Sequence, residues 1–145
     1  MTPAQLAAQT AKWAVTMTKV RIRRAESRAA PRWHFVTFLG PNGGESRGVV
    51  DLIAVRKNHR DPAPGTKRGD VLQIILIQVK GGSAARPTVE DGKRLRIVAR
   101  RHGACRVLLA SWKKGTAAKF SSLSERPRKG SSDWDEVKKL SEIFG

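Results

Sequence analysis

The segment 71–80, VLQIILIQVK, constrains the fold of this chain more than any other feature. It is the most strongly apolar segment, and Gly81 and Gly82 follow it directly. Aliphatic and β-branched residues bounded by glycines are typical of a strand, whereas a membrane-spanning helix needs about 20 apolar residues. We therefore predict a strand over Val71–Lys80, and other elements must cover the faces of its sheet.

Two further strands are predicted before this segment. Trp33–Leu39 is aromatic and β-branched, and the glycine-rich turn 40–44 (GPNGG) predicts a hairpin into a second strand, Gly48–Lys57. The turn lacks the Gly-Lys-Ser/Thr ending of a phosphate-binding P-loop. Residues 58–69 are rich in proline, glycine, histidine and charge, which predicts a loop.

The first residues of the chain have a helical pattern, from which we predict a helix over Pro3–Lys19. Its expected inner face is the stripe Leu6, Trp13, Met17 and Val20. Residues 1–25 contain no Asp or Glu and carry several basic residues, so an organelle transit peptide is the alternative interpretation.

A second helix is predicted after the central strand. Thr88 is a good N-cap, acidic residues lie in the first turn, basic residues lie in the last, and Gly103 follows as a stop. Ala104–Trp112 is predicted as a fourth strand. Phe120 and Leu123 indicate a short extra strand, while residues 133–144 have helical spacing, although their first half is equally consistent with a strand.

The predicted order of elements is αβββαβ, followed by a C-terminal element. Consecutive strands favour an antiparallel meander, whereas a helix between two strands favours a parallel crossover. The fold class is therefore α/β. Its mixed sheet contains an antiparallel meander, as α+β proteins do, and helices pack on the faces of the sheet. At 145 residues we expect a single domain over 1–145, with a core of about 3–112 and a C-terminal extension over 113–145.

The formal net charge of +17 makes a polyanion the first partner to consider, and nucleic acid is the commonest one. The single cysteine, Cys105, excludes an intrachain disulfide and fits a reducing compartment, so we expect a cytoplasmic protein without a membrane span. Basic residues bind phosphates without reading sequence. Those expected to contact nucleic acid are Arg56, Lys57, Arg94, Arg100, Arg101, Lys113 and Lys114.

Polar residues at the ends of two predicted strands form the candidate site. Asp51 precedes an apolar run, and Gln78 and Lys80 emerge on one face at the end of the central strand. Mg²⁺ takes oxygen ligands, with one or two from carboxylates. Asp51, the amide oxygen of Gln78 and the backbone carbonyl of Val79 could hold such an ion, and Lys80 could stabilise charge on a phosphate.

Asp51 in VVDLIAVRK (49–57), followed by Gln78-Val79-Lys80 in LIQVKGG (76–82) and a helix-strand unit, resembles the PD-(D/E)XK nuclease superfamily. The chain is most similar to its Holliday-junction-resolvase-like and restriction-endonuclease-like members. The resemblance implies an αβββαβ restriction-endonuclease-like core and a Mg²⁺- or Mn²⁺-dependent phosphodiesterase acting on DNA. Asp51 falls on the metal-ligand position and Lys80 on the catalytic lysine. A homodimer is also implied, since related resolvases cut paired strands.

The sequence departs from the family pattern at several positions. Gln78 stands where Glu or Asp is usual, and the first helix offers Gln5 and Gln9 in place of a glutamate. Glu45 is the nearest acid that could serve as a third ligand. The alternative function is a catalytically inactive nucleic-acid-binding module with a nuclease-like fold. A ribosome-associated RNA-binding protein would also explain the charge, but would leave Asp51 and Lys80 unexplained.

Overall fold

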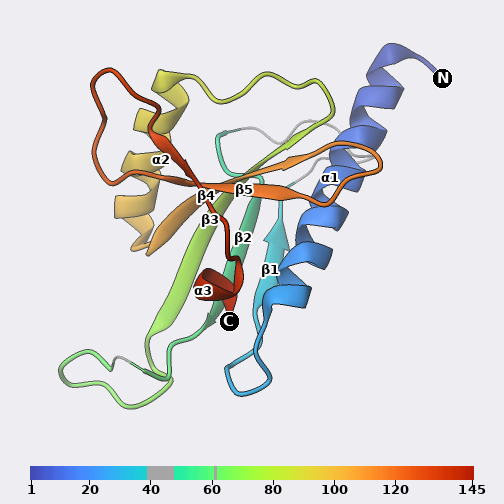
Figure 1. The fold of residues 1–145 in the computed structure, drawn as a ribbon. Coiled ribbons are helices and arrows are strands. Elements are labelled where there is room, and N and C mark those ends of the chain that lie inside the picture. The colour runs from blue at the N-terminus through green and yellow to red at the C-terminus, as the bar shows by residue number, and fades with distance from the viewer. Residues whose placement is uncertain (39–47, 61) are drawn as a thin grey trace.

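A computed structural model describes residues 1–38, 48–60 and 62–145 of the chain (Figure 1). Its centre is a six-stranded sheet in which the strands are neighbours in chain order, β1 to β6. The strands are β1 (His34–Thr37), β2 (Leu52–Lys57), β3 (Leu72–Gly81), β4 (Arg106–Trp112), β5 (Lys119–Leu123) and β6 (Trp134–Glu136). The helices are α1 (Pro3–Ala25), α2 (Val89–His102) and α3 (Ser141–Phe144).

The pairing of the strands confirms the predicted mixed sheet. β1, β2 and β3 are antiparallel, β3 and β4 are parallel with α2 as the crossover, and β5 and β6 continue the sheet antiparallel. The αβββαβ order is therefore confirmed, and the extra strand expected near Phe120 and Leu123 is β5. Residues 133–144 form both structures that the sequence allowed, first a strand and then a short helix.

Helices cover the two faces of the sheet, α1 and α3 on one and α2 on the other (Figure 1). Alternation along β3 sends Ile75 and Ile77 into the core beneath α1, together with Ile22, and Leu76 into the core beneath α2, together with Leu95. β3 therefore has side chains in both cores, as its apolar run predicts.

The inner face predicted for the first helix was wrong. α1 runs on to Ala25, and it buries the face that carries Ala14, Thr18 and Ile22. Leu6 and Trp13 are 57% and 52% exposed. The first turns of α1 extend past the end of the sheet (Figure 1), and Trp13 lies outside the buried face that carries Ala14, Thr18 and Ile22. Spacing alone predicted a stripe, but contact with the sheet decides which stripe is buried.

The C-terminal residues close the core beside α1. Phe144 packs edge-on against Trp33 at a ring-centroid distance of 5.3 Å, and the Trp33 indole N–H donates to the Phe144 carbonyl at 3.0 Å. Both side chains are fully buried. The three residue ranges that the structure describes contain no helix with the length and apolar character needed to cross a membrane.

Candidate functional site

Asp51 lies directly before β2 and links three strands. Its backbone N–H donates to the Ile77 carbonyl at 3.0 Å, and its carbonyl accepts from the Phe38 N–H at 3.0 Å. Its carboxylate oxygen Oδ2 accepts from the Val79 N–H at 2.8 Å. These contacts hold the carboxylate at the C-terminal end of β3, next to the residues predicted to share its site.

Gln78 lies between the two β3 residues that Asp51 contacts. The Asp51 N–H donates to the Ile77 carbonyl and the Asp51 carboxylate accepts from the Val79 N–H, so the two contacts that hold Asp51 flank Gln78 on β3. Gln78 is only 6% exposed. Its Oε1 is buried and has no hydrogen-bond partner among the described residues. A buried acceptor without a donor costs about 1–3 kcal/mol, so this oxygen is available to a cation at little further expense.

Lys80 is partly buried and emerges on the same face as Gln78, two residues further along β3. Its partner in the parallel pairing with β4 is Ser111, which is exposed. Across residues 1–38, 48–60 and 62–145, Lys80 forms no ion pair. Sequence reasoning missed Ser111, because nothing before the pairing of β3 with β4 indicates that it neighbours Lys80.

Gly81 explains how α1 is seated beside this end of β3. A Cβ atom on Gly81 would lie 3.0 Å from the Ala14 Cβ and 3.2 Å from the Thr10 backbone oxygen. Such contacts are too close for a side chain to fit without movement. The absence of a side chain at Gly81 therefore lets α1 pack directly on the residue that follows Lys80.

The oxygen donors at this end of the sheet fit a hard divalent cation that retains water or phosphate ligands. Asp51 supplies an anion, and Gln78 supplies a buried amide oxygen that lacks a partner. Mg²⁺ commonly takes one or two carboxylates, with water and substrate phosphate as further ligands. The described residues contain no cluster of three or more His, Cys, Asp or Glu side chains suited to a metal. A metal ion at this site would therefore depend more on oxygen atoms of the substrate than a metal ion at a site with several carboxylates does.

The other residues considered as ligands do not add to this set in the described structure. Glu45 lies outside the described residues. Gln5 belongs to the capping box of α1, where its Oε1 accepts from the Thr2 N–H at 2.8 Å. Gln9, expected on the inner face of the first helix, is exposed, because the buried face of α1 is the one through Ala14.

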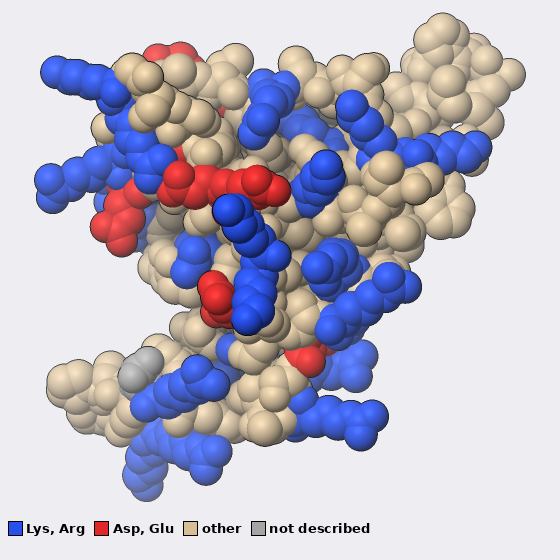
Figure 2. Space-filling model, viewed as in Figure 1, with Lys and Arg blue, Asp and Glu red and all other residues tan. Residues whose placement is uncertain are grey.

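The basic residues predicted to contact nucleic acid are divided between the two ends of the sheet. Lys113 and Lys114 follow β4 at the end that carries Lys80, and both are exposed. Exposed Lys57 ends β2, about 20 Å from Asp51 at roughly 3.3 Å per residue. Arg100 and Arg101 lie in the last turn of α2, also at the far end, and exposed Arg94 lies between. Figure 2 shows Lys and Arg across one face of the molecule, with few acidic side chains between them.

Arg56 is a correction to the predicted surface. It is only 7% exposed, and its guanidinium lies 4.3 Å from the ring centroid of Trp33. Its Nε donates to Gln73 Oε1 at 2.8 Å, and its terminal nitrogens reach the carbonyls of Phe144 and Gly145 at 3.4 and 3.2 Å. Burial, then the charge of nearby Arg60, lower its pKa. The side chain alternates inward along β2, so it stabilises the fold and is not available to DNA.

The architecture is a restriction-endonuclease-like α/β fold, with a mixed sheet between helices and polar residues at the end of its central strands. Among solved structures, the chain resembles Hjc, a Holliday junction resolvase from the hyperthermophilic archaeon Archaeoglobus fulgidus. The TM-score is 0.51 at 16% sequence identity, over 92% of this chain and 99% of that one. The sequence matches no protein-family model and no curated protein.

Proposed function

We propose that this protein is a Mg²⁺- or Mn²⁺-dependent endonuclease that hydrolyses DNA phosphodiester bonds, with branched DNA such as Holliday junctions as its substrate class. The observation that supports the proposal is the hydrogen bond from the Val79 N–H to the Asp51 carboxylate, which holds this anion at the end of β3 that carries Gln78 and Lys80. Likeness of the fold to a Holliday junction resolvase supports it. The free Cys105 is consistent with a cytoplasmic protein.

Each residue has a distinct part in the proposed chemistry. A divalent ion held by Asp51, Gln78 and the Val79 carbonyl would supply Lewis-acid activation of water and of the scissile phosphate. Lys80, on the same face, would stabilise the negative charge that develops on the phosphate oxygens. The hydrogen bond from the Val79 N–H keeps the Asp51 carboxylate in place for this role.

Lys113 and Lys114 would bind the DNA backbone beside the site. Both are exposed at the end of β4, which is paired with β3 through Lys80 and Ser111. Lysine contacts with phosphate position DNA without specifying its sequence. Such contacts suit an enzyme directed by the shape of its substrate. A homodimer would supply a second site for the opposite strand of a junction.

The alternative is a nucleic-acid-binding module that retains the fold but does not cleave. The specific observation in its favour is the amide at position 78, together with the finding that the described residues contain no cluster of three or more His, Cys, Asp or Glu side chains suited to a metal. The two functions differ in their dependence on metal. Cleavage requires the divalent ion, whereas binding to phosphates through Lys113 and Lys114 does not.

Cleavage of a fluorescent four-way junction and of a matched linear duplex, in Mg²⁺, Mn²⁺ or EDTA, tests the proposal. Asp51→Asn removes the charge but retains an acceptor for the Val79 N–H, and Lys80→Met removes the ammonium. Each should slow cleavage by about 100-fold or more while junction binding persists. Asp70→Asn is the matched control, because Asp70 Oδ2 also accepts a backbone N–H, from Lys67 at 2.8 Å, at the far end of the sheet.

The outcomes separate the two functions. Cleavage that survives both Asp51→Asn and Lys80→Met would show that the reaction occurs elsewhere. Tight junction binding with no cleavage in either metal would favour the binding module. Equal loss of cleavage in Asp70→Asn would indicate a general effect of charge or stability, and would remove the support for a site at Asp51.

A further inference from the structure

Two adjoining cavities lie between the C-terminal half of α1 and the turn from β4 to β5. Their volumes are about 300 and 270 Å³, and they share Arg21 and residues 116–118 as lining. Met17, Val20 and Trp112 give the first an apolar wall, and Phe120, Val137 and Leu140 do the same for the second. We call the two together the α1 groove. It lies on the α1 face of the sheet, whereas Gln78 and Lys80 emerge on the α2 face.

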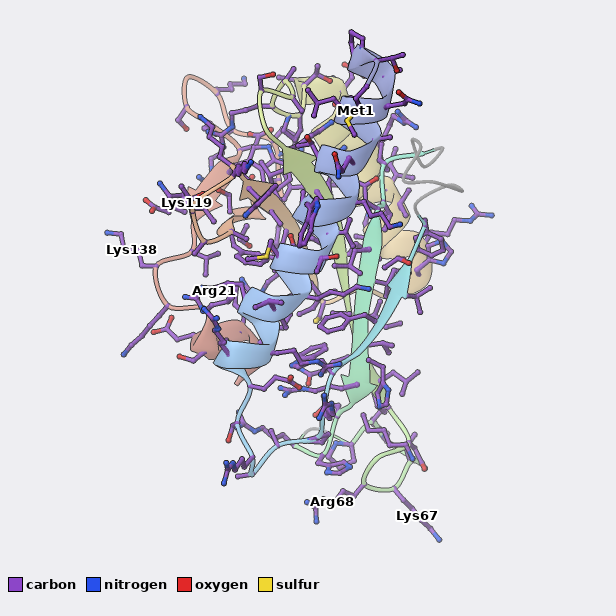
Figure 3. All side chains as sticks on the ribbon, turned by 90° about the vertical axis from the view of Figure 1, so that its right-hand side faces the viewer. Met1, Arg21, Lys67, Arg68, Lys119 and Lys138 are labelled. Atoms are coloured by element: carbon purple, nitrogen blue, oxygen red, sulfur yellow. The ribbon has the colours of Figure 1, made fainter. Side chains whose placement is uncertain are left out.

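The rim of the α1 groove is basic. Arg21 and Arg24 line the first cavity, and Lys119 lines the second together with a single acid, Glu136. In the described part of the chain, neither Arg21 nor Arg24 forms an ion pair. Figure 3 shows Arg21, Lys119 and Lys138 on the same side of α1. This excess of unpaired positive charge favours an anionic ligand.

Aromatic groups accompany the charge. The indole Nε1 of Trp112, a residue that lines the first cavity, is buried and has no hydrogen-bond partner among the described residues. Trp13 is exposed, and it lies four and seven residues before Met17 and Val20, so it continues their stripe on α1. The fitting ligand therefore combines a flat apolar group, hydrogen-bond acceptors and negative charge. A nucleotide has all three.

The groove also adjoins the end of the sheet that carries Lys80. Gly82, two residues beyond Lys80, donates its N–H to the Trp112 carbonyl at 2.8 Å. Neighbouring strands are only about 4.8 Å apart. Lys113 and Lys114 come directly after Trp112, in the turn whose later residues line both cavities. A chain of phosphates could therefore pass over this end of the sheet from one face to the other.

From these contacts we propose that the α1 groove binds a short stretch of unpaired nucleic acid. Arg21, Arg24 and Lys119 contact its phosphates, and Trp13 and the apolar walls contact its bases. Aromatic surfaces beside a basic channel are how single strands are bound without sequence preference. The cavities suit individual nucleotides and not a duplex, whose major groove alone is about 12 Å wide. This binding does not depend on the metal site, although an unpaired strand at a branch point could occupy both.

Fluorescence anisotropy with a fluorescein-labelled 12-nucleotide oligothymidine, in EDTA, tests the proposal without cleavage. Arg21→Ala/Arg24→Ala should weaken binding about tenfold and reduce the slope of log K against log salt concentration by about 1.4, the value for two lost phosphate contacts on a single strand. Lys67→Ala/Arg68→Ala is the control with the same change in charge. These residues lie in the loop at the far end of the sheet, and the control should change affinity less than about twofold (Figure 3).

A second variant tests the groove without a change in charge. Ala117 is exposed and lines both cavities, so Ala117→Leu should obstruct them without adding an aromatic surface and weaken oligothymidine binding by about tenfold, while affinity for a blunt duplex stays the same. Unchanged oligothymidine affinity in Ala117→Leu would overturn the proposal, as would equal losses in the two double variants. Competition by polyglutamate as strong as that by unlabelled oligothymidine would identify an acidic peptide as the ligand, and would also overturn it. If these variants still cleave the junction, the proposed nuclease function is unaffected, whether or not the groove binds single strands.

Discussion

The backbone N–H of Val79 donates a 2.8 Å hydrogen bond to Oδ2 of Asp51, which ties the carboxylate of the candidate site to the end of β3. The same side chain is therefore both a proposed metal ligand and a structural acceptor between two strands. Substitutions at Asp51 will separate the two roles only if they distinguish charge from hydrogen-bonding capacity.

Asp51→Ala should lower the free energy of unfolding by about 1–2 kcal/mol, because the partly buried Val79 N–H loses its acceptor. Asp51→Asn retains an acceptor and should cost less than about 0.5 kcal/mol. Urea denaturation of the two variants in EDTA measures the difference. Equal destabilisation would mean that the charge, and not the hydrogen bond, stabilises this end of β3.

Gln78→Glu should tighten the binding of Mn²⁺, because it adds an anion at the position of the unpaired amide oxygen, next to Val79, whose N–H holds the Asp51 carboxylate. Isothermal titration calorimetry with Mn²⁺ on the full chain measures the effect, for which we expect about a tenfold gain. Gln73→Glu is a control of the same chemistry at the other end of β3 and should leave the affinity unchanged. If Gln78→Glu binds Mn²⁺ no better than the natural chain, Gln78 does not ligate the metal.

Two glycine-to-alanine substitutions should have opposite effects on stability. Gly81→Ala forces a Cβ to 3.0 Å from the Ala14 Cβ and should destabilise by about 1–3 kcal/mol. Gly92→Ala lies within α2, where the nearest atoms to the new Cβ are at 3.7 Å, and it should stabilise by up to about 1 kcal/mol. Thermal denaturation of both variants checks the signs. A stabilising Gly81→Ala would contradict the close seating of α1.

Glu26 should make stability depend on pH in the acid range. Burial raises its pKa, but hydrogen bonds from Arg23 and from the Trp33 N–H outweigh this and hold the pKa below the ordinary 4.5. A depressed carboxyl pKa stabilises the fold above the unfolded value, and this stability is lost as pH falls through the folded value. Natural chain and Glu26→Gln should differ by about 1 kcal/mol at pH 7, and the difference should shrink below pH 4.5. A difference independent of pH would exclude a role for the charge.

The lysines at the site end of the sheet should matter more for junction binding than the arginines at the far end of α2. Lys113→Ala/Lys114→Ala should reduce the slope of log K against log salt concentration by about 1.8 for a short-armed junction. Arg100→Ala/Arg101→Ala should reduce it by less, since these residues lie in the last turn of α2, which leads into β4 at the end opposite Lys80. Titrations at several salt concentrations in EDTA provide the comparison. An equal reduction of the slope in the two variants would contradict this prediction. It would mean that cations anywhere on the surface contribute alike to binding and that Lys113 and Lys114 make no specific contact with the DNA backbone.

Local patterns were sufficient for most of the fold. The apolar run ending in Gln78 and Lys80 predicted the central strand, since a ten-residue segment with this composition and glycine boundaries has few other stable conformations. The Thr88 cap and the Gly103 stop predicted both ends of α2 closely, because capping depends on neighbouring backbone groups. The order of elements then restricted the topology to a mixed sheet.

The errors have a common physical cause. Helical spacing predicted a stripe through Leu6 and Trp13, but only the sheet determines which side of α1 is covered, and its first turns pass beyond the sheet. Arg56 resembled a surface cation because its charge is visible in the sequence, whereas the ring of Trp33 and the carbonyls of Phe144 and Gly145 are far away along the chain.

The sequence by itself therefore determined which residues could perform chemistry, because alternation along a strand places Gln78 and Lys80 on one face whatever surrounds them. Only the tertiary structure decided that the Asp51 carboxylate bonds to the Val79 N–H, that Ser111 lies beside Lys80 and that the cations of α1 line a groove. Each of these relationships depends on the register between strands or on the seating of a helix. Both are fixed by contacts between residues distant in the chain, so local sequence patterns cannot reveal them.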